Sequence, residues 1–142
     1  MRTGICAATG IIGSIVATFF GGWSDGLTTL VIFMCIDYIS GIVVAGVFQK
    51  SRKTESGALE SRAGWKGICR KCMTLILVLV AYRLDLLRGE GTLIRDAVTI
   101  AFTANEGLSI LENAVLMGLK VPAPLQKALE VLMTKAEEVD DK

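Results

Sequence analysis

Apolar residues along the chain fall into four long runs, separated by short polar segments and followed by a polar tail. A transmembrane helix needs about 20 predominantly apolar residues to cross a hydrocarbon core of about 30 Å. Runs of this length exceed the interrupted stripes of a globular core, so the pattern predicts a single all-α, polytopic membrane domain spanning residues 1–119. The predicted transmembrane helices are residues 5–22, 27–48, 68–87 and 92–119.

The first predicted span is built on small residues at helical spacing. Lipid tails are as apolar as leucine, so membrane helices associate through close backbone contact, which small residues at every fourth position permit. We expect this helix to pack against others; the alternative is a short, weak helix at the membrane interface. The small residues assigned to helix packing, in this span and the next, are Gly10, Gly13, Ala17, Gly21, Gly41 and Ala45.

A single carboxylate, Asp37, lies near the middle of the second predicted span. A charge there costs about 2.5 to 3.5 kcal/mol, whereas each large apolar residue returns about 0.3 to 0.6 kcal/mol, so the segment still inserts. Ionisable groups at this depth face a bundle interior or an aqueous cavity and are functional candidates. Asp37 is therefore predicted either to hydrogen-bond a neighbouring span or to act in triggering or lining a pore.

The fourth predicted span is amphipathic, with two polar rows on one side. One row holds Asp96, Thr99, Thr103, Glu106 and Asn113, and the row beside it holds Asn105, Ser109 and Glu112. The buried carboxylates and amides would offset most of the insertion energy of this helix, so it needs polar partners or water. Asn105, Glu106, Glu112 and Asn113 are predicted to contact another span, another copy of the chain, or pore water.

The hydrophilic loop of residues 49–71 is strongly basic. It carries Lys50, Arg52, Lys53, Arg62, Lys66, Arg70 and Lys71 against only Glu55 and Glu60. The positive-inside rule places a short loop of this kind in the cytoplasm, where it can also meet anionic lipid headgroups. Four spans then leave both termini in the cytoplasm. Nucleic-acid binding is the weaker interpretation, because only Trp65 is available for stacking.

A cytoplasmic amphipathic tail, residues 120–142, follows the last predicted span. Pro122 and Pro124 end the fourth helix, because proline cannot continue the helical hydrogen-bond ladder. Beyond them, apolar residues recur at alternating spacings of four and three, at Leu125, Leu129, Leu132, Ala136 and Val139. The tail is predicted to form either a helix on the membrane surface or a small coiled-coil contact between copies.

Composition excludes most catalytic chemistry. The chain has 142 residues, of which 52% are hydrophobic, and its net charge of +1 argues against binding nucleic acid by phosphate neutralisation. The absence of histidine excludes histidine-based metal and catalytic sites, and the Cys69–Cys72 pair has no second pair to complete a structural zinc site. We find no phosphate-binding loop or catalytic triad, and therefore expect no enzyme, no metal and no cofactor.

Three sequence elements occur together between about residues 30 and 130. The first is Asp37-Tyr38-Ile39-Ser40-Gly41, the second is the basic segment from Ser61 to Gly67 with Arg70-Lys71, and the third is N-E-x-x-S-I-x-E-N at residues 105–113, followed by Gly118 and Pro122. Together they resemble the bacteriophage holin family, which includes clostridial toxin-secretion holins. The third element is the most specific of the three.

The resemblance implies a small multi-pass protein of the bacterial cytoplasmic membrane that oligomerises and opens a lesion. The lesion would release a cell-wall hydrolase (endolysin) or a large toxin, leading to lysis or secretion. The implied partners are further copies of the chain, membrane lipid and the released cargo, with no nucleic acid. Buried carboxylates also suit two other classes. A small ion channel or transporter would retain proteins, and a structural subunit of a larger membrane complex would do nothing alone.

Overall fold

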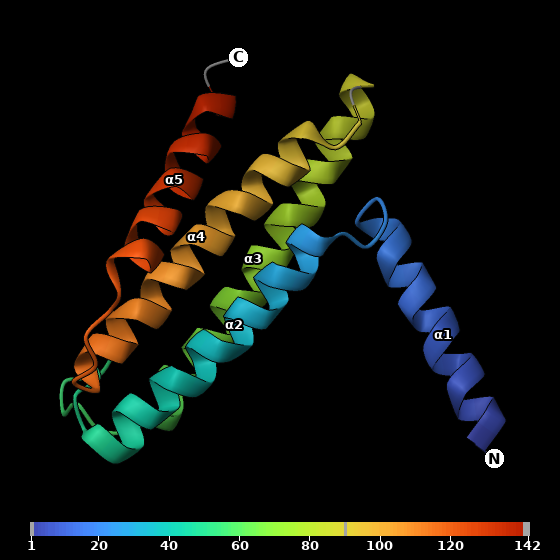
Figure 1. The fold of residues 1–142 in the computed structure, drawn as a ribbon. Coiled ribbons are helices and arrows are strands. Elements are labelled where there is room, and N and C mark those ends of the chain that lie inside the picture. Colours follow the sequence, from blue (N-terminus) through green and yellow to red (C-terminus); the bar gives the residue numbers. More distant parts are fainter. Residues whose placement is uncertain (1, 90, 141–142) are drawn as a thin grey trace.

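The computed structural model describes residues 2–89 and 91–140, with side chains described for residues 9–89 and 91–136. These ranges contain helices and no strand (Figure 1), which confirms the all-α prediction. The helices are α1 (Arg2–Phe19), α2 (Asp25–Val43), α3 (Ser61–Arg88), α4 (Leu93–Leu116) and α5 (Ala123–Asp140), and a π-helical turn η1 (Val44–Phe48) continues α2.

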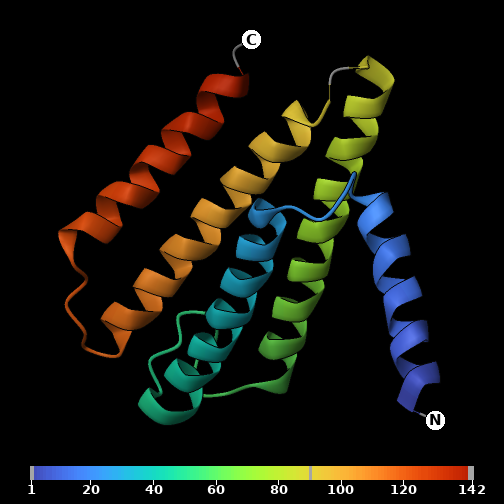
Figure 2. The same ribbon diagram turned by 45° about the vertical axis from the view of Figure 1, so that its right-hand side comes forward.

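Helices α2, α3 and α4 form an antiparallel bundle with α4 in contact with both of the others, and α5 packs along α4 (Figures 1 and 2). The core of the bundle is apolar and lies toward the start of α2. Leu27, Leu30 and Met34 of α2 meet Val78 of α3, and Phe102 of α4 packs against them. Close packing of these side chains gives many dispersion contacts, which help to hold the three helices together.

Helix α1 stands apart from the bundle (Figures 1 and 2). Its small-residue face is open, because a Cβ atom added at Gly10 or Gly13 would meet nothing within 4 Å. Its large apolar residues are also exposed, among them Ile11, Ile12 and Phe19. Within one chain the described side chains of this helix, residues 9–19, therefore pack against little, and the packing of this helix against other helices stays a prediction.

Local signals explain where the helices begin and end. Ser24 caps α2, since its Oγ accepts a hydrogen bond from the backbone N–H of Leu27 at 3.2 Å. Gly89 ends α3 with a φ of 74°, a left-handed conformation that glycine adopts without strain. Between α4 and α5 lie Gly118, with a φ of 89°, and Pro122. The predicted break between these two helices is confirmed.

Helix α3 begins at Ser61 rather than at residue 68, so the second half of the predicted loop is helical and the loop itself is 49–60. Hydropathy marks only the apolar part of a helix, and lysine and arginine are good helix formers, which explains the error. Gly64 and Gly67 lie inside this helix where the Tyr38 side chain of α2 covers them. A Cβ atom at these glycines would lie 3.5 Å and 3.7 Å from Tyr38 atoms.

Among the described helices, only Asp25–Phe48, which joins α2 and η1, is both long and apolar enough to cross a membrane. Residues Thr9–Phe19 of α1 form a shorter apolar helix. Helices α3 and α4 have the length, but charged side chains interrupt their apolar stretches. The prediction of four spans therefore stays a prediction.

Candidate functional site

Asp37 is buried at the centre of a hydrogen-bond network that joins α2, α3 and α4. Its Oδ1 accepts hydrogen bonds from Ser109 Oγ at 2.5 Å and from Asn113 Nδ2 at 3.2 Å, both on α4. Its Oδ2 accepts a hydrogen bond from Lys71 Nζ of α3 at 2.8 Å. Donors from two other helices thus take the place of water around the carboxylate, which offsets the cost of placing it inside an apolar helix.

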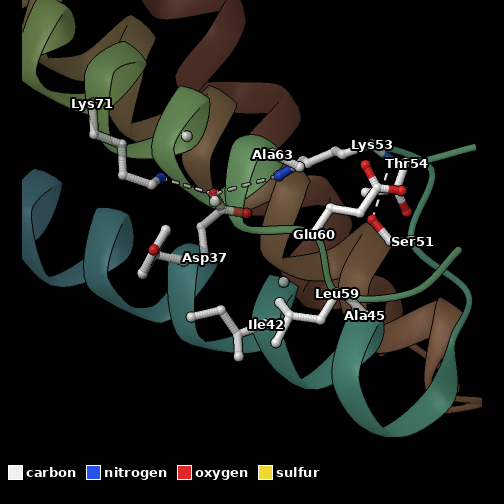
Figure 3. A pocket seen from close by; sticks show the side chains of 14 residues that line it. Asp37, Ile42, Ala45, Ser51, Lys53, Thr54, Leu59, Glu60, Ala63 and Lys71 are labelled. Atoms are coloured by element: carbon white, nitrogen blue, oxygen red, sulfur yellow. Dashed lines mark hydrogen bonds and ion pairs between the residues drawn. The ribbon is translucent and has the colours of Figure 1, made fainter.

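Lys71 bridges two carboxylates. Its Nζ donates to Asp37 and also to Glu106 Oε2 of α4 at 2.5 Å, and its side chain is only 17% exposed. A second ammonium, that of Lys53 in the loop, lies 4.0 Å from Asp37 Oδ2 (Figure 3). Two carboxylates and two ammonium groups therefore balance in formal charge, and breaking one pair would leave a buried charge without its partner. We call Asp37, Lys53, Lys71, Glu106, Ser109 and Asn113 the charge network.

Asn113 ties the network to the backbone of α2. Its Nδ2 lies 2.8 Å from Ser40 Oγ and 3.4 Å from the carbonyl oxygen of Asp37. Ser40 Oγ donates to that same carbonyl at 3.1 Å. No buried side-chain nitrogen or oxygen atom in the described part of the chain lacks a hydrogen-bond partner. The charge network is therefore closed within one copy of the chain.

The polar residues predicted on the fourth span separate into two groups. Glu106, Ser109 and Asn113 share one face of α4, as positions three and four apart do, and this face meets α2 and α3. Asn105 and Glu112 are exposed and lie outside the charge network. Glu112 instead lines a groove between α4 and α5, which Arg52 and Glu130 also line.

The basic residues also separate into two groups. Lys53 and Lys71 join the charge network, whereas the others lie exposed on the loop and the start of α3, at Lys50, Arg52, Arg62, Lys66 and Arg70. Lys71 was predicted to be a headgroup or loop residue, and the structure places it inside the bundle instead. One signal in the sequence points there, because extending the buried positions Val78 and Thr74 of α3 back by one helical step reaches Lys71.

The predicted packing residues also differ in their surroundings. Gly41 faces the network, since a Cβ atom there would lie 3.9 Å from Asn113 Nδ2, and Ala45 is buried. Gly21 lies under the ring of Tyr82, where a Cβ atom would collide with the ring. Ala17 is half-buried, and Gly10 and Gly13 are open.

A second polar cluster, which the sequence did not reveal, lies at the other end of the bundle from the charge network. It joins the end of α3 and the end of α1 to the first turn of α4. The buried Asp85 of α3 accepts hydrogen bonds from the backbone N–H groups of Ile94 (2.9 Å) and Arg95 (2.8 Å), which caps the first turn of α4. The guanidinium of Arg95 donates to the carbonyl oxygens of Phe20 at 2.8 Å and Gly21 at 3.2 Å. Arg95 therefore holds the chain at the end of α1 against the bundle.

Neither cluster has the composition of a metal site in the described part of the chain. Within the described residues, no three histidine, cysteine, aspartate or glutamate side chains gather in a way that could hold a metal ion. The charge network instead pairs carboxylates with lysines and amides, which stabilises one arrangement of helices.

Ionisable side chains within a membrane span face the bundle interior or an aqueous cavity, and Asp37 of the helix of membrane length is enclosed in the bundle. The model of the bacteriophage holin family matches residues 14–134. The chain is 30% identical to a probable holin of Bacillus phage phi105, over 90% of the chain and 89% of that protein. It is 39% identical to an uncharacterized protein of Listeria monocytogenes, over 92% of the chain and 87% of that protein. No solved structure matches the chain.

This chain therefore belongs to the bacteriophage holin family. A further relative, an uncharacterized 14.9 kDa protein of Clostridium perfringens, is 34% identical over 87% of the chain and 89% of that protein. Membership supports a holin role in general terms, and the family implies a protein of the cytoplasmic membrane.

Proposed function

We propose that this chain is a holin that oligomerises in the bacterial cytoplasmic membrane and forms a lesion through which a cell-wall hydrolase or a large toxin leaves the cell. The observation that carries the proposal is the enclosed polar face of α4. Glu106, Ser109 and Asn113 are satisfied by Asp37 and Lys71 of the same copy. A single copy can therefore rest in the membrane without exposing these groups to lipid.

In this proposal the lesion opens when the polar face of α4 leaves α2 and α3 and contacts water or another copy instead. Breaking a buried ion pair costs about 3 to 5 kcal/mol if one charge stays unpaired, so α4 separates only where water or another copy replaces α2 and α3. Many copies that rearrange together supply both replacements. Asn105 and Glu112 already face outward, where they can contact neighbouring copies or line the lesion.

We propose that α1, α2, α3 and α4 each cross the membrane, with the loop 49–60 in the cytoplasm. The alternation of the helices supports this topology. The start of α1, the loop 49–60 and the α4–α5 connection lie at one end of the molecule, and the α3–α4 turn lies at the other (Figures 1 and 2). The exposed basic residues of the loop and of the start of α3 then lie near the cytoplasmic headgroups.

Helix α5 is proposed to leave α4 upon insertion and to lie on the cytoplasmic membrane surface. In the structure α5 runs back along α4, and Leu129 is its one buried residue among residues 123–136. The exposed charges Lys127, Glu130 and Lys135 make this position unfavourable at hydrocarbon depth. An amphipathic helix at the interface satisfies both faces, and it keeps the C-terminus on the side of the loop.

The proposed contact between copies includes α1. Its open glycine face and its exposed isoleucines suit close approach by a helix of another copy. Arg95 holds the chain at the end of α1, and the exposed side chains of residues 10–16 are available to meet a neighbour.

Expressing the chain alone in bacteria tests the proposal. Membrane potential and the escape of a folded cytoplasmic reporter protein are followed in the same culture. A holin collapses the potential and releases the reporter, whereas an ion channel collapses the potential and retains it. A subunit that needs a partner complex changes neither. Either of the last two results would overturn the proposed function.

A further inference from the structure

A cavity of about 60 Å³ adjoins the charge network on the side of the loop 49–60 (Figure 3). Asp37, Tyr38 and Ala45 of α2 and η1 line it, together with Lys53 of the loop and Lys71 of α3. A buried water needs about 10 to 15 Å³ of such volume, so the cavity has room for about four waters. Space alone therefore permits hydration next to Asp37.

Most of the cavity lining is apolar, but some lining groups are polar and could serve as the partners that buried water requires. A water is stable inside a protein when it makes two to four hydrogen bonds to polar groups. The carboxylate of Asp37 and the ammonium groups of Lys53 and Lys71 meet at the cavity. The Lys53 side chain is 55% exposed although its Nζ lies 4.0 Å from a carboxylate whose side chain is 7% exposed. The Lys53 side chain therefore extends from solvent at the loop to the buried carboxylate of Asp37.

The opposite side of the charge network is apolar. Met34 lies one turn from Asp37 toward the start of α2 and belongs to the apolar core, together with Leu30 and Val78. Leu30 and Val78 are fully buried, and Phe102 of α4 packs against them. We call Leu30, Met34, Val78 and Phe102 the apolar layer. A layer of this kind offers water no hydrogen-bond partner, so hydration that enters from the loop ends at Met34.

We propose that this cavity is a water-filled vestibule, open toward the loop 49–60 and closed by the apolar layer, that keeps Asp37 and Lys71 in contact with loop-side solution while the holin is still closed. The inference rests on the membrane setting of the proposed function but not on the release of any cargo. It explains how a charged pair is tolerated in a membrane helix before oligomers rearrange: the pair is hydrated from one side.

The vestibule is tested by thiol labelling in closed membranes. The four native cysteines are replaced by serine, and single cysteines are introduced at Ala45, which lines the cavity, and at Val44, which is equally buried but does not line it. Ser56→Cys, exposed in the loop, is the reference, and Val78→Cys probes the apolar layer. Inverted vesicles that still hold their potential are treated with a charged, membrane-impermeant methanethiosulfonate.

The vestibule predicts that Ala45→Cys reacts within about tenfold of the rate of Ser56→Cys, and that Val44→Cys and Val78→Cys react at least about 100-fold more slowly, because access to water controls thiol reactivity. Ala45→Cys reacting no faster than Val44→Cys would show a dry cavity and overturn the inference. If Val78→Cys reacted as fast as Ala45→Cys, water would reach the apolar layer, and this result would overturn the inference as well. Both comparisons are made within one vesicle preparation, so they are independent of whether the chain later releases a reporter.

Discussion

Asp37 is accommodated in an apolar helix because donors from α3 and α4 surround its carboxylate. Lys71 links all three helices of the network, since its ammonium group contacts Asp37 of α2 at 2.8 Å and also Glu106 of α4. Neutralising Lys71 leaves two carboxylates facing each other across the bundle, whereas neutralising Asp37 still leaves Lys71 paired with Glu106. The two substitutions are therefore expected to differ in severity.

The first prediction concerns Lys71→Met. Loss of the shared ammonium should lower the free energy of unfolding by about 3 to 5 kcal/mol, because both buried carboxylates lose a partner. Arg70→Met, an exposed neighbour on the same helix, should change stability by less than about 0.5 kcal/mol. Thermal denaturation of the purified variants in detergent measures the difference.

Adding Asp37→Asn to Lys71→Met should recover part of the lost stability, because one of the two unpaired charges disappears. Equal melting temperatures for Lys71→Met and Arg70→Met would show that the charge network contributes nothing to the fold.

The second prediction separates the two polar groups of α4. Asn113→Ala removes hydrogen bonds to both Asp37 and Ser40 and should cost about 1 to 3 kcal/mol of stability. Asn105→Ala, exposed on the same helix, should cost less than about 0.5 kcal/mol. Its effect should instead be on the timing of reporter release, if Asn105 contacts other copies. Release timing and melting temperature are measured for both variants. A lower melting temperature for Asn105→Ala, together with altered release timing and unchanged stability for Asn113→Ala, would contradict this account.

At the scale of the helices, α4 is the element on which the fold depends, since it contacts α2, α3 and α5. Each end of α4 is fixed differently. Its first turn is capped by Asp85 and carries Arg95, while its second half carries the charge network. Separation of the second half can therefore begin without loss of the cap, with the first turn as the point that stays attached.

The third prediction concerns the attachment of α1. Arg95→Ala should free the chain end at Phe20 and Gly21, because both carbonyl oxygens lose the guanidinium. Amide exchange across residues 15–22 should then rise by about tenfold or more, as expected when local opening becomes easier. Arg83→Ala, exposed on α3, is the matched control and should leave this exchange unchanged. Unchanged exchange in Arg95→Ala would show that α1 is held by other contacts.

Much of this architecture could be predicted from the sequence because apolar runs and the polar residues inside them are local signals. Asp37, Glu106 and Asn113 stand out for that reason. Lys71 does not stand out, because it follows a run of exposed basic residues and only the helical step from Val78 reveals its side. The roles of Asp85 and Arg95 depend on how helix ends meet in space, which no local pattern records. The start of α3 was missed because charged helical turns resemble loops in hydropathy.

At the scale of the whole molecule, polar and apolar regions alternate along the bundle. The exposed basic residues and the charge network lie toward the loop 49–60, the apolar layer lies beyond them, and the Arg95 cluster lies at the far end. In the proposed orientation Asp37 lies near the middle of the helix of membrane length, so the charge network is at bilayer depth and the apolar layer lies in the half of the membrane beyond it. The exposed basic residues at the loop end support the proposal that the bundle stands across the bilayer with its loop in the cytoplasm.

The fourth prediction concerns the C-terminus. A fluorescent protein that folds only in the cytoplasm, fused after residue 142, should be bright, because α5 is proposed to lie on the loop side. Alkaline phosphatase at the same position should be inactive. The reverse pair of results would place α5 across the membrane beside α4, as it lies in the isolated chain.

The central claim is that the charge network closes the molecule and must open before cargo passes. Ser40→Cys and Asn113→Cys, made together in the cysteine-free chain, place thiols where Oγ and Nδ2 now lie 2.8 Å apart on α2 and α4. A short, reducible bis-methanethiosulfonate then joins the two helices, and reporter release is measured before and after reduction. We predict no release from the cross-linked chain and full release once the link is reduced, matching the double variant without cross-linker. Release from the fully cross-linked chain would contradict the account.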